Sequence, residues 1–168
     1  GFWYLGSQGK LPAALQDLYN RIMGGSGFRK LTLSVIGVPG RPVIVSNPGQ
    51  QFRLQYDFEY RGLPIPVGQA WTPSLPREQV RGCYVGHYIY PAGHPGLLNE
   101  WGQRHYVNLS LPFSPIWTRY SISTTYTFNP ASYNGGVGGL WDASALILVD
   151  DGKRTAVSKL YSDLFRVA

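Results

Sequence analysis

Apolar and polar residues alternate along most of the chain after Phe28. The clearest case is the stretch 51–61, QFRLQYDFEYR, which alternates large apolar residues with charged or amide residues. A strand with this pattern buries one face, and its inward residues would be Phe52, Leu54, Tyr56, Phe58 and Tyr60. Further strands are predicted over 28–38, 41–47, 82–91, 104–113, 119–128, 142–150 and 158–168.

The connections between these strands are long and rich in proline and glycine, over 62–77, 91–102 and 129–140. Many strands joined in this way favour an all-β fold, an antiparallel two-sheet sandwich of the jelly-roll type. In the stretch VNLSLPFSPIW, 107–117, the alternation stops at two prolines, so we expect the strand to end there and a loop to follow.

One short helix is predicted before the strands. Leu11, Leu15, Leu18 and Ile22 fall on one helical face, Pro12 suits a first turn, and the glycines at 24–25 would end the helix after about 10 residues. We therefore expect residues 1–27 to form an N-terminal arm with this helix, and residues 28–168 to form the β-sandwich of a single domain.

Charge is scarce for a chain of 168 residues. Only 14% of the residues are charged, against roughly 25% in ordinary globular domains. Because charged residues are depleted at interface cores, this shortage favours a surface that is partly buried against other proteins. The net charge of +6 comes from scattered residues, so we expect at most nonspecific electrostatic contact with RNA. No apolar run approaches the roughly 18 residues of a membrane span.

The chemically active residue types form no recognisable catalytic pattern. His87, His94 and His105, with Glu100, are the candidate metal ligands, but their spacing fits no compact zinc pattern. Asp150 and Asp151 precede Gly152, as in a hairpin turn, and Ser114 lies outside a nucleophile elbow. Cys83 is expected to be a buried structural thiol. We predict no enzyme, no catalytic, cofactor-binding or metal-binding residues, and no cofactor. A cupin-like metal enzyme remains a distant alternative.

Four tryptophans fall in or beside predicted loops: Trp71, Trp101, Trp117 and Trp141. Exposed aromatic faces can stack on sugars, so a carbohydrate-binding, lectin-like module is one alternative. Tryptophan is also common at protein interfaces, where its large apolar surface is buried, and we expect this second role or simple packing under the loops.

Several motifs occur in the same order as in one family. They are LQDLYNRIMGGSGFRKLTLSV (15–35), GCYVGHYIYPAG (82–93), the Pro-aromatic-Ser step Leu111–Ser114, GGLWDASALILVDDG (138–152) and YSDLFRVA (161–168). Together they resemble the capsid proteins of picorna-like viruses, of the dicistrovirus and iflavirus kind. The resemblance covers the chain from about Leu11 onward. Met23 stands where the family usually has Arg, and no Asp-Asp-Phe motif is present, so we assign no maturation cleavage.

The resemblance implies a jelly-roll capsid subunit whose first family strand is absent from this chain. That strand would lie in a segment outside this sequence or be supplied by another chain. Such a subunit would assemble in the host cytoplasm, with copies of itself and related subunits, into the icosahedral shell of a virion that encloses an RNA genome; the host receptor is unknown. Large apolar anchors dominate interfaces of this kind. The expected interface residues are Trp71, Phe113, Ile116, Trp117 and Trp141.

Overall fold

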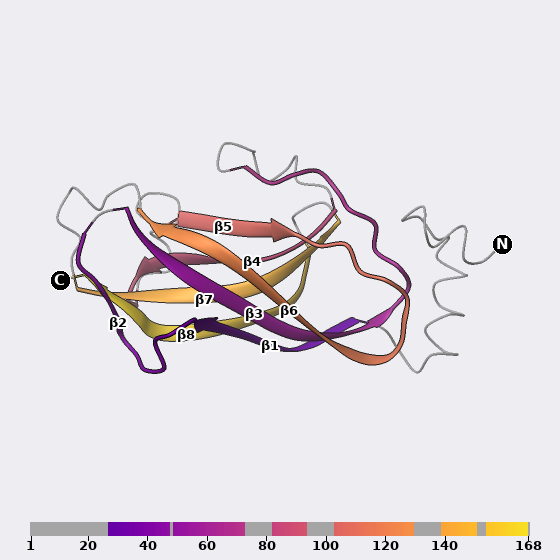
Figure 1. Ribbon diagram of the computed structural model, residues 1–168, viewed down its shortest axis with the longest axis horizontal. Helices are drawn as coiled ribbons and strands as arrows, with labels where there is room; N and C mark the ends of the chain where they lie inside the picture. The colour runs from indigo at the N-terminus through magenta and orange to yellow at the C-terminus, as the bar shows by residue number, and fades with distance from the viewer. Residues whose placement is uncertain are drawn as a thin grey trace.

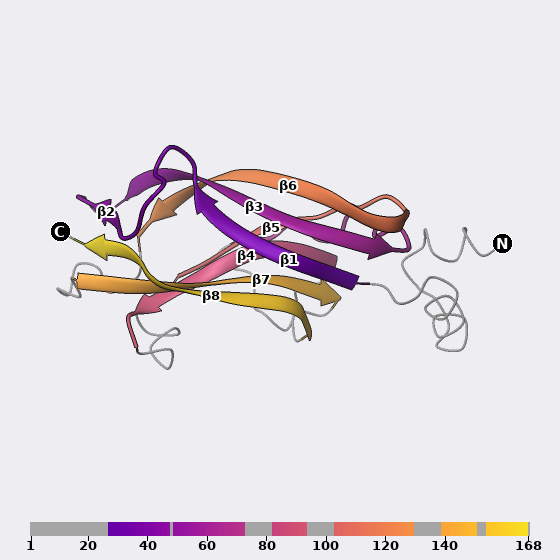
Figure 2. The same ribbon diagram turned by 90° about the horizontal axis from the view of Figure 1, so that it is seen from below.

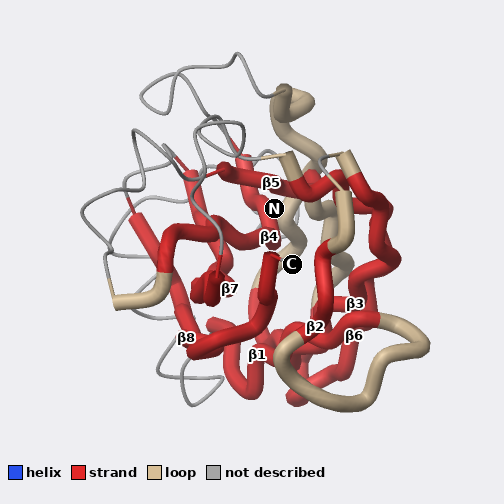
Figure 3. The backbone as a smooth tube through the Cα atoms, turned by 90° about the vertical axis from the view of Figure 1, so that its left-hand side faces the viewer, coloured by secondary structure: helices blue, strands red, loops and turns tan. Residues whose placement is uncertain are grey.

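The protein is a β-sandwich. The computed structural model describes residues 27–47, 49–72, 82–93, 103–129, 139–150 and 154–167, and these contain strands, turns and loops but no helix (Figure 3). The prediction of an all-β, two-sheet fold is confirmed (Figures 1 and 2). The predicted helix and residues 1–26 of the arm lie outside the described residues. The strands are β1 (Gly27–Val35), β2 (Val43–Val45), β3 (Gln50–Gly62), β4 (Gly82–Pro91), β5 (Gln103–Asn108), β6 (Ser114–Phe128), β7 (Gly139–Asp150) and β8 (Arg154–Val167).

The smaller sheet has the order β1-β3-β6, and the larger has the order β2-β8-β7-β4-β5. All pairs are antiparallel except β2 with β8, which is parallel. Consecutive strands pair directly within the larger sheet, β4 with β5 and β7 with β8. This order does not confirm the jelly roll, which is a double Greek key. It corresponds instead to the order of immunoglobulin-type sandwiches.

The core lies between the sheets. From the smaller sheet, Leu54, Tyr56, Phe58 and Tyr60 point inward and are buried, as their alternation in β3 predicts. Phe52, the fifth predicted inward residue, is partly buried and packs against the same core. The facing strands of the larger sheet contribute buried residues, among them Cys83, Val85, His87 and Ile89 from β4 and Trp141, Ala143, Ala145 and Ile147 from β7.

A second buried cluster covers the outer face of the larger sheet. It comprises Tyr84, Tyr106, Leu146 and Leu148, with Trp71 and Tyr88 packed against them. The segment 63–72 is held to the strands beside this cluster, because the Tyr84 hydroxyl donates to the carbonyl of Gln69 and the Asn108 side chain donates to the carbonyl of Gly68. The near-continuous apolar sequence of β4 follows from burial on both faces.

The predicted loop after Phe113 is wrong. Strand β5 ends at Asn108, Leu111 forms an isolated bridge with Ile65, and β6 begins at Ser114, so Pro115 and Trp117 lie in a strand. β6 is one of the two edge strands of the smaller sheet. Proline is tolerated at the start of an edge strand because the side that lacks an N–H can face solvent and not a neighbouring strand.

Candidate functional site

Apolar side chains are exposed where the chain crosses from the smaller sheet to the larger one. Ile36 and Val38 lie in the crossing segment and are 46% and 40% exposed, and Ile44 on β2 is 50% exposed. The register places Ile44 and Leu140 on either side of Arg166, and Leu140 is also exposed. We call Ile36, Val38, Ile44 and Leu140 the β1–β2 surface. Exposed apolar groups on neighbouring segments of this kind are typical of protein interfaces.

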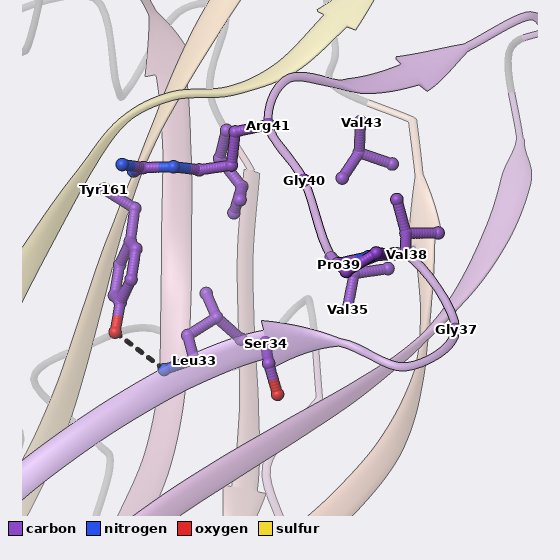
Figure 4. A pocket seen from close by; sticks show the side chains of 11 residues that line it. Leu33, Ser34, Val35, Gly37, Val38, Pro39, Gly40, Arg41, Val43 and Tyr161 are labelled. Carbon is purple, nitrogen blue, oxygen red and sulfur yellow. Dashed lines mark hydrogen bonds between the residues drawn. The ribbon is translucent and has the colours of Figure 1, made fainter.

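A pocket of about 520 Å³ opens beside this surface (Figure 4). Its floor is formed by buried apolar side chains, Leu33, Val35, Val43 and Leu164, and its wall by residues 37–41 of the crossing segment. Figure 4 shows the Tyr161 side chain at one side of the pocket, with its hydroxyl accepting a hydrogen bond from the Leu33 N–H at 2.9 Å. An apolar recess of this size can accept the side chain of a partner protein.

Arg41, at the margin of the pocket, contacts strand β8. Nη1 of Arg41 donates to the carbonyl of Ser162 at 3.2 Å, and the guanidinium carbon lies 5.8 Å from the centre of the Tyr161 ring. Nζ of Lys159 lies 5.4 Å from the same ring. The pocket therefore combines an apolar floor with positive charge at its margin.

A basic cluster lies at one end of the outer face of the smaller sheet. We define it as Arg29, Lys30, Arg61 and Arg119, grouped around Glu59 and Trp117. Strand pairing places Arg29 opposite Glu59 and Glu59 opposite Arg119. Nε of Arg29 donates to Glu59 Oε1 at 2.6 Å, and Nζ of Lys30 lies 3.8 Å from the same oxygen. These cations, with the Arg29 hydrogen bond first, lower the pKa of the Glu59 carboxyl.

Trp117 stacks with two of these cations. The guanidinium carbon of Arg29 lies 4.1 Å from the centre of the indole ring, and that of Arg61 lies 4.7 Å from it. Attraction between a cation and an aromatic face stabilises such pairs by about 0.5–1 kcal/mol where they are exposed. No sequence run of basic residues reveals this cluster, because only Arg29 and Lys30 are adjacent in the chain.

The five residues predicted at an interface do not form one patch. Phe113, Ile116 and Trp117 lie close together at the start of β6, and Ile116 is 72% exposed, whereas the other two are partly buried. Trp71 packs on Tyr106 over the larger sheet, with ring centres 5.4 Å apart. Trp141 is 0% exposed and packs on Phe128 in the core, so it presents no surface to a partner.

The structure describes two of the four candidate metal ligands, His87 and His105. His87 is fully buried, its Nδ1 lies 2.5 Å from the Tyr56 hydroxyl, and burial lowers its pKa to about 3, with a smaller effect from His105. Nε2 of His105 pairs with the Thr124 hydroxyl at 3.1 Å. His94 and Glu100, like Trp101, fall outside the described residues. Within the part of the chain that the structure describes, no three His, Cys, Asp or Glu residues form a metal-binding group.

The surroundings of Ser114 and Cys83 indicate structural roles for both side chains. Ser114 is buried, and its hydroxyl pairs with that of Tyr120 at 2.8 Å. Cys83, the single cysteine of the sequence, is buried, as predicted. Asp151 and Gly152 lie outside the described residues. Across the described ranges, no helix is long and apolar enough to cross a membrane.

The sequence matches no protein-family model and no curated protein. Among solved structures, it is similar to the β-glucosidase of Listeria innocua, at 9% identity and a TM-score of 0.42, over 84% of this chain and 16% of that one. An alkylpurine DNA glycosylase of Pseudomonas fluorescens bound to DNA matches at 12% identity and a TM-score of 0.40, over 96% and 36% of the two chains.

The CARDB domain of a Pyrococcus furiosus protein, in complex with di-metal ions, is similar at 13% identity and a TM-score of 0.41, over 84% of this chain and 90% of that one. This chain thus spans about a sixth of the β-glucosidase and about a third of the glycosylase. At these identities and TM-scores, the likenesses assign neither a family nor an activity to the chain.

Proposed function

We propose that this chain is a structural subunit that assembles with copies of itself and related subunits into an icosahedral virion shell around an RNA genome. The sequence resemblance to picorna-like capsid proteins implies this role. The observation that carries it is the β1–β2 surface, where exposed Val38 lines a pocket with an apolar floor, and exposed Ile36 and Ile44 directly follow the lining residues Val35 and Val43 in the chain.

This surface suits contact with another protein for two reasons. Burying apolar groups of this kind contributes about 25 cal/mol per Å² removed from water. The adjoining pocket provides a recess for an anchor side chain, and such anchors contribute most to protein interfaces. A chain with only 14% charged residues gains more than most from covering such a surface. The proposal rests on this surface and not on the strand order, which differs from that of a jelly roll.

The exposed start of β6 is a second proposed contact. Ile116, near the start of β6, is 72% exposed. A closed shell needs at least two different contacts on each subunit, because a single self-complementary contact yields only a dimer. We therefore expect the β1–β2 surface and Ile116 to contact different neighbours.

The carbohydrate-binding alternative has less support. Sugar stacking requires an open aromatic face, whereas Trp141 is buried in the core and Trp117 is stacked with two guanidinium groups. The metal-enzyme alternative would need His87 and His105 as ligands. Instead, they pair with Tyr56 and Thr124.

The proposal is tested by the mass and shape of the expressed full chain, measured by light scattering and electron microscopy, alone and with its natural neighbouring subunits. We expect defined closed particles for the wild type, and smaller species for Val38→Asp and Ile44→Asp. The matched control is Val67→Asp, because Val67 is 68% exposed but lies outside the β1–β2 surface. Thermal melting checks that all three variants remain folded. Monomers under every condition, or equal loss of assembly in the Val67→Asp control, would overturn the proposal.

A further inference from the structure

The basic cluster concentrates charge that is spread along the chain. Strand pairing across the smaller sheet brings Arg29 from β1, Arg61 from β3 and Arg119 from β6 to one end of one face, and Lys30, in the irregular part of β1, joins them through its contact with Glu59. Counted over the described residues, the cluster has four cations against the carboxylate of Glu59, a net charge of +3. If Asp57 is counted, whose carboxylate lies 3.7 Å from Nη2 of Arg119, the net charge is still +2.

The acidic groups leave much of this charge available to a ligand. Glu59 accepts from Nε of Arg29, so this ion pair does not occupy the two terminal nitrogens of that guanidinium. The carboxylate of Asp57 accepts hydrogen bonds from the Ser121 hydroxyl and the Gln55 amide. The side chains of Lys30 and Arg119 remain 67% and 70% exposed.

Trp117 orders two of the arginine side chains in the cluster. By stacking with Arg29 and Arg61, the indole restricts two long side chains that would otherwise lose rotamer freedom on binding. Planar guanidinium groups match the geometry of phosphate oxygens and can bind them through two parallel hydrogen bonds. A ligand with repeated phosphates, spaced along a flexible backbone, fits this arrangement.

We propose that the basic cluster binds the phosphate backbone of single-stranded RNA, with Lys30 and Arg119 as exposed contacts and Arg29 and Arg61 as guanidinium groups positioned by Trp117. This proposal rests on the proposed function only for the identity of the nucleic acid as RNA. It implies that the outer face of the smaller sheet faces the interior of the shell.

The test uses the full chain and a fluorescently labelled oligouridylate, with anisotropy measured over a range of salt concentrations. The variant Lys30→Gln/Arg119→Gln removes two cations. We expect its affinity to fall about tenfold or more, and the slope of log affinity against log salt to become shallower by about 1.4, because each phosphate contact to a single strand contributes about 0.7. The matched control, Arg104→Gln/Lys159→Gln, removes the same charge from strands of the larger sheet and should retain the wild-type slope.

A further variant tests the positioning of the arginines by Trp117 separately from the number of charges. Trp117→Leu keeps every cation but removes the ring that orders Arg29 and Arg61, so we expect affinity to fall about threefold with a nearly unchanged salt slope. Equal weakening in the Gln pair and its control would overturn the proposal, because it would indicate attraction by net charge alone. Heparin serves as a competitor, added so that its sulfate concentration equals the phosphate concentration of the RNA. If heparin displaces the RNA equally from the wild type and from Trp117→Leu, the proposal is also overturned.

The outcome is independent of the assembly test. Normal particles from the Lys30→Gln/Arg119→Gln variant that retain as much RNA as wild type would refute the RNA site and leave the shell proposal intact. Tight, site-dependent RNA binding by a chain that never assembles would support the site and refute the shell.

Discussion

The hydroxyl of Tyr56 lies 2.5 Å from Nδ1 of His87, and this contact joins the two sheets through the middle of the core. Both side chains are fully buried, and the ring of Tyr126 packs edge-on against His87 with ring centres 4.5 Å apart. Nε2 of His87 has no hydrogen-bond partner among the described residues. Because a charge in these surroundings would be largely unpaired, His87 is neutral, and burial also raises the pKa of Tyr56.

Stability should therefore fall as the solution becomes acidic. His87 has a pKa of about 3 in the folded chain against 6.5 in the unfolded chain, so between these values the unfolded state binds one proton more. The free energy of unfolding should be unaffected by this group above pH 6.5 and should fall by up to about 1.4 kcal/mol per pH unit below it. Urea unfolding from neutral pH down to about pH 4 measures this dependence. A flat profile over that range would show that His87 is accessible to water.

The Tyr56–His87 pair should be energetically coupled. Tyr56→Phe leaves Nδ1 of His87 unpaired, and His87→Leu leaves the Tyr56 hydroxyl unpaired, so each should reduce the free energy of unfolding by about 1–3 kcal/mol. The double variant should cost less than the sum of the two, because no polar group then remains unpaired. Denaturant titration of the four proteins measures the coupling, and strict additivity would contradict it. His87→Leu should also weaken the acid dependence.

Gly86 should tolerate no side chain. A Cβ atom at this position would lie 2.0 Å from the carbonyl oxygen of His105 and 2.8 Å from Cα of Tyr106, so β5 would have to move away from β4. We expect Gly86→Ala to reduce the free energy of unfolding by at least about 1–3 kcal/mol. Gly40→Ala is the matched control, because a Cβ there meets nothing within 4 Å. Similar melting temperatures for the two variants would contradict the close approach.

Two tryptophans should respond very differently to truncation. Trp141 is buried in the core, so Trp141→Ala should cost about 3–5 kcal/mol of folding stability. Trp117→Ala removes two cation–aromatic contacts on the surface and should cost only about 1–2 kcal/mol. Denaturant unfolding of both variants checks this order. The reverse order would place Trp117 in the core.

The strands were predictable where a strand has one buried and one exposed face. β3 has such surroundings, so its alternation identified both the strand and its inward residues. The start of β6 was not predictable in this way, because Pro115 is excluded from central strands but tolerated at an edge, and the sequence does not state which strand is an edge. The strand order depends on contacts between distant segments and was not predicted either.

The candidate sites depend still more on long-range pairing. The basic cluster joins residues 29, 30, 61 and 119, and only the register of β1, β3 and β6 brings them together. For His87 a local signal was present, since it alternates with Cys83, Val85 and Ile89, which all point into the core. For Trp141, the preceding glycines suggested a loop, but β7 begins at Gly139 and directs Trp141 inward.

The central strands β4 and β7 of the larger sheet are buried on both faces along most of their length, whereas the smaller sheet has one face open to water. The two sheets should therefore differ in how quickly their amide protons exchange with deuterated solvent. The amides of β4 and β7, central in the larger sheet, should exchange only when the whole domain unfolds, while those of β6, at the open edge, should exchange through small local openings. Strands β4 and β7 would then be the last part of the fold to retain amide protons.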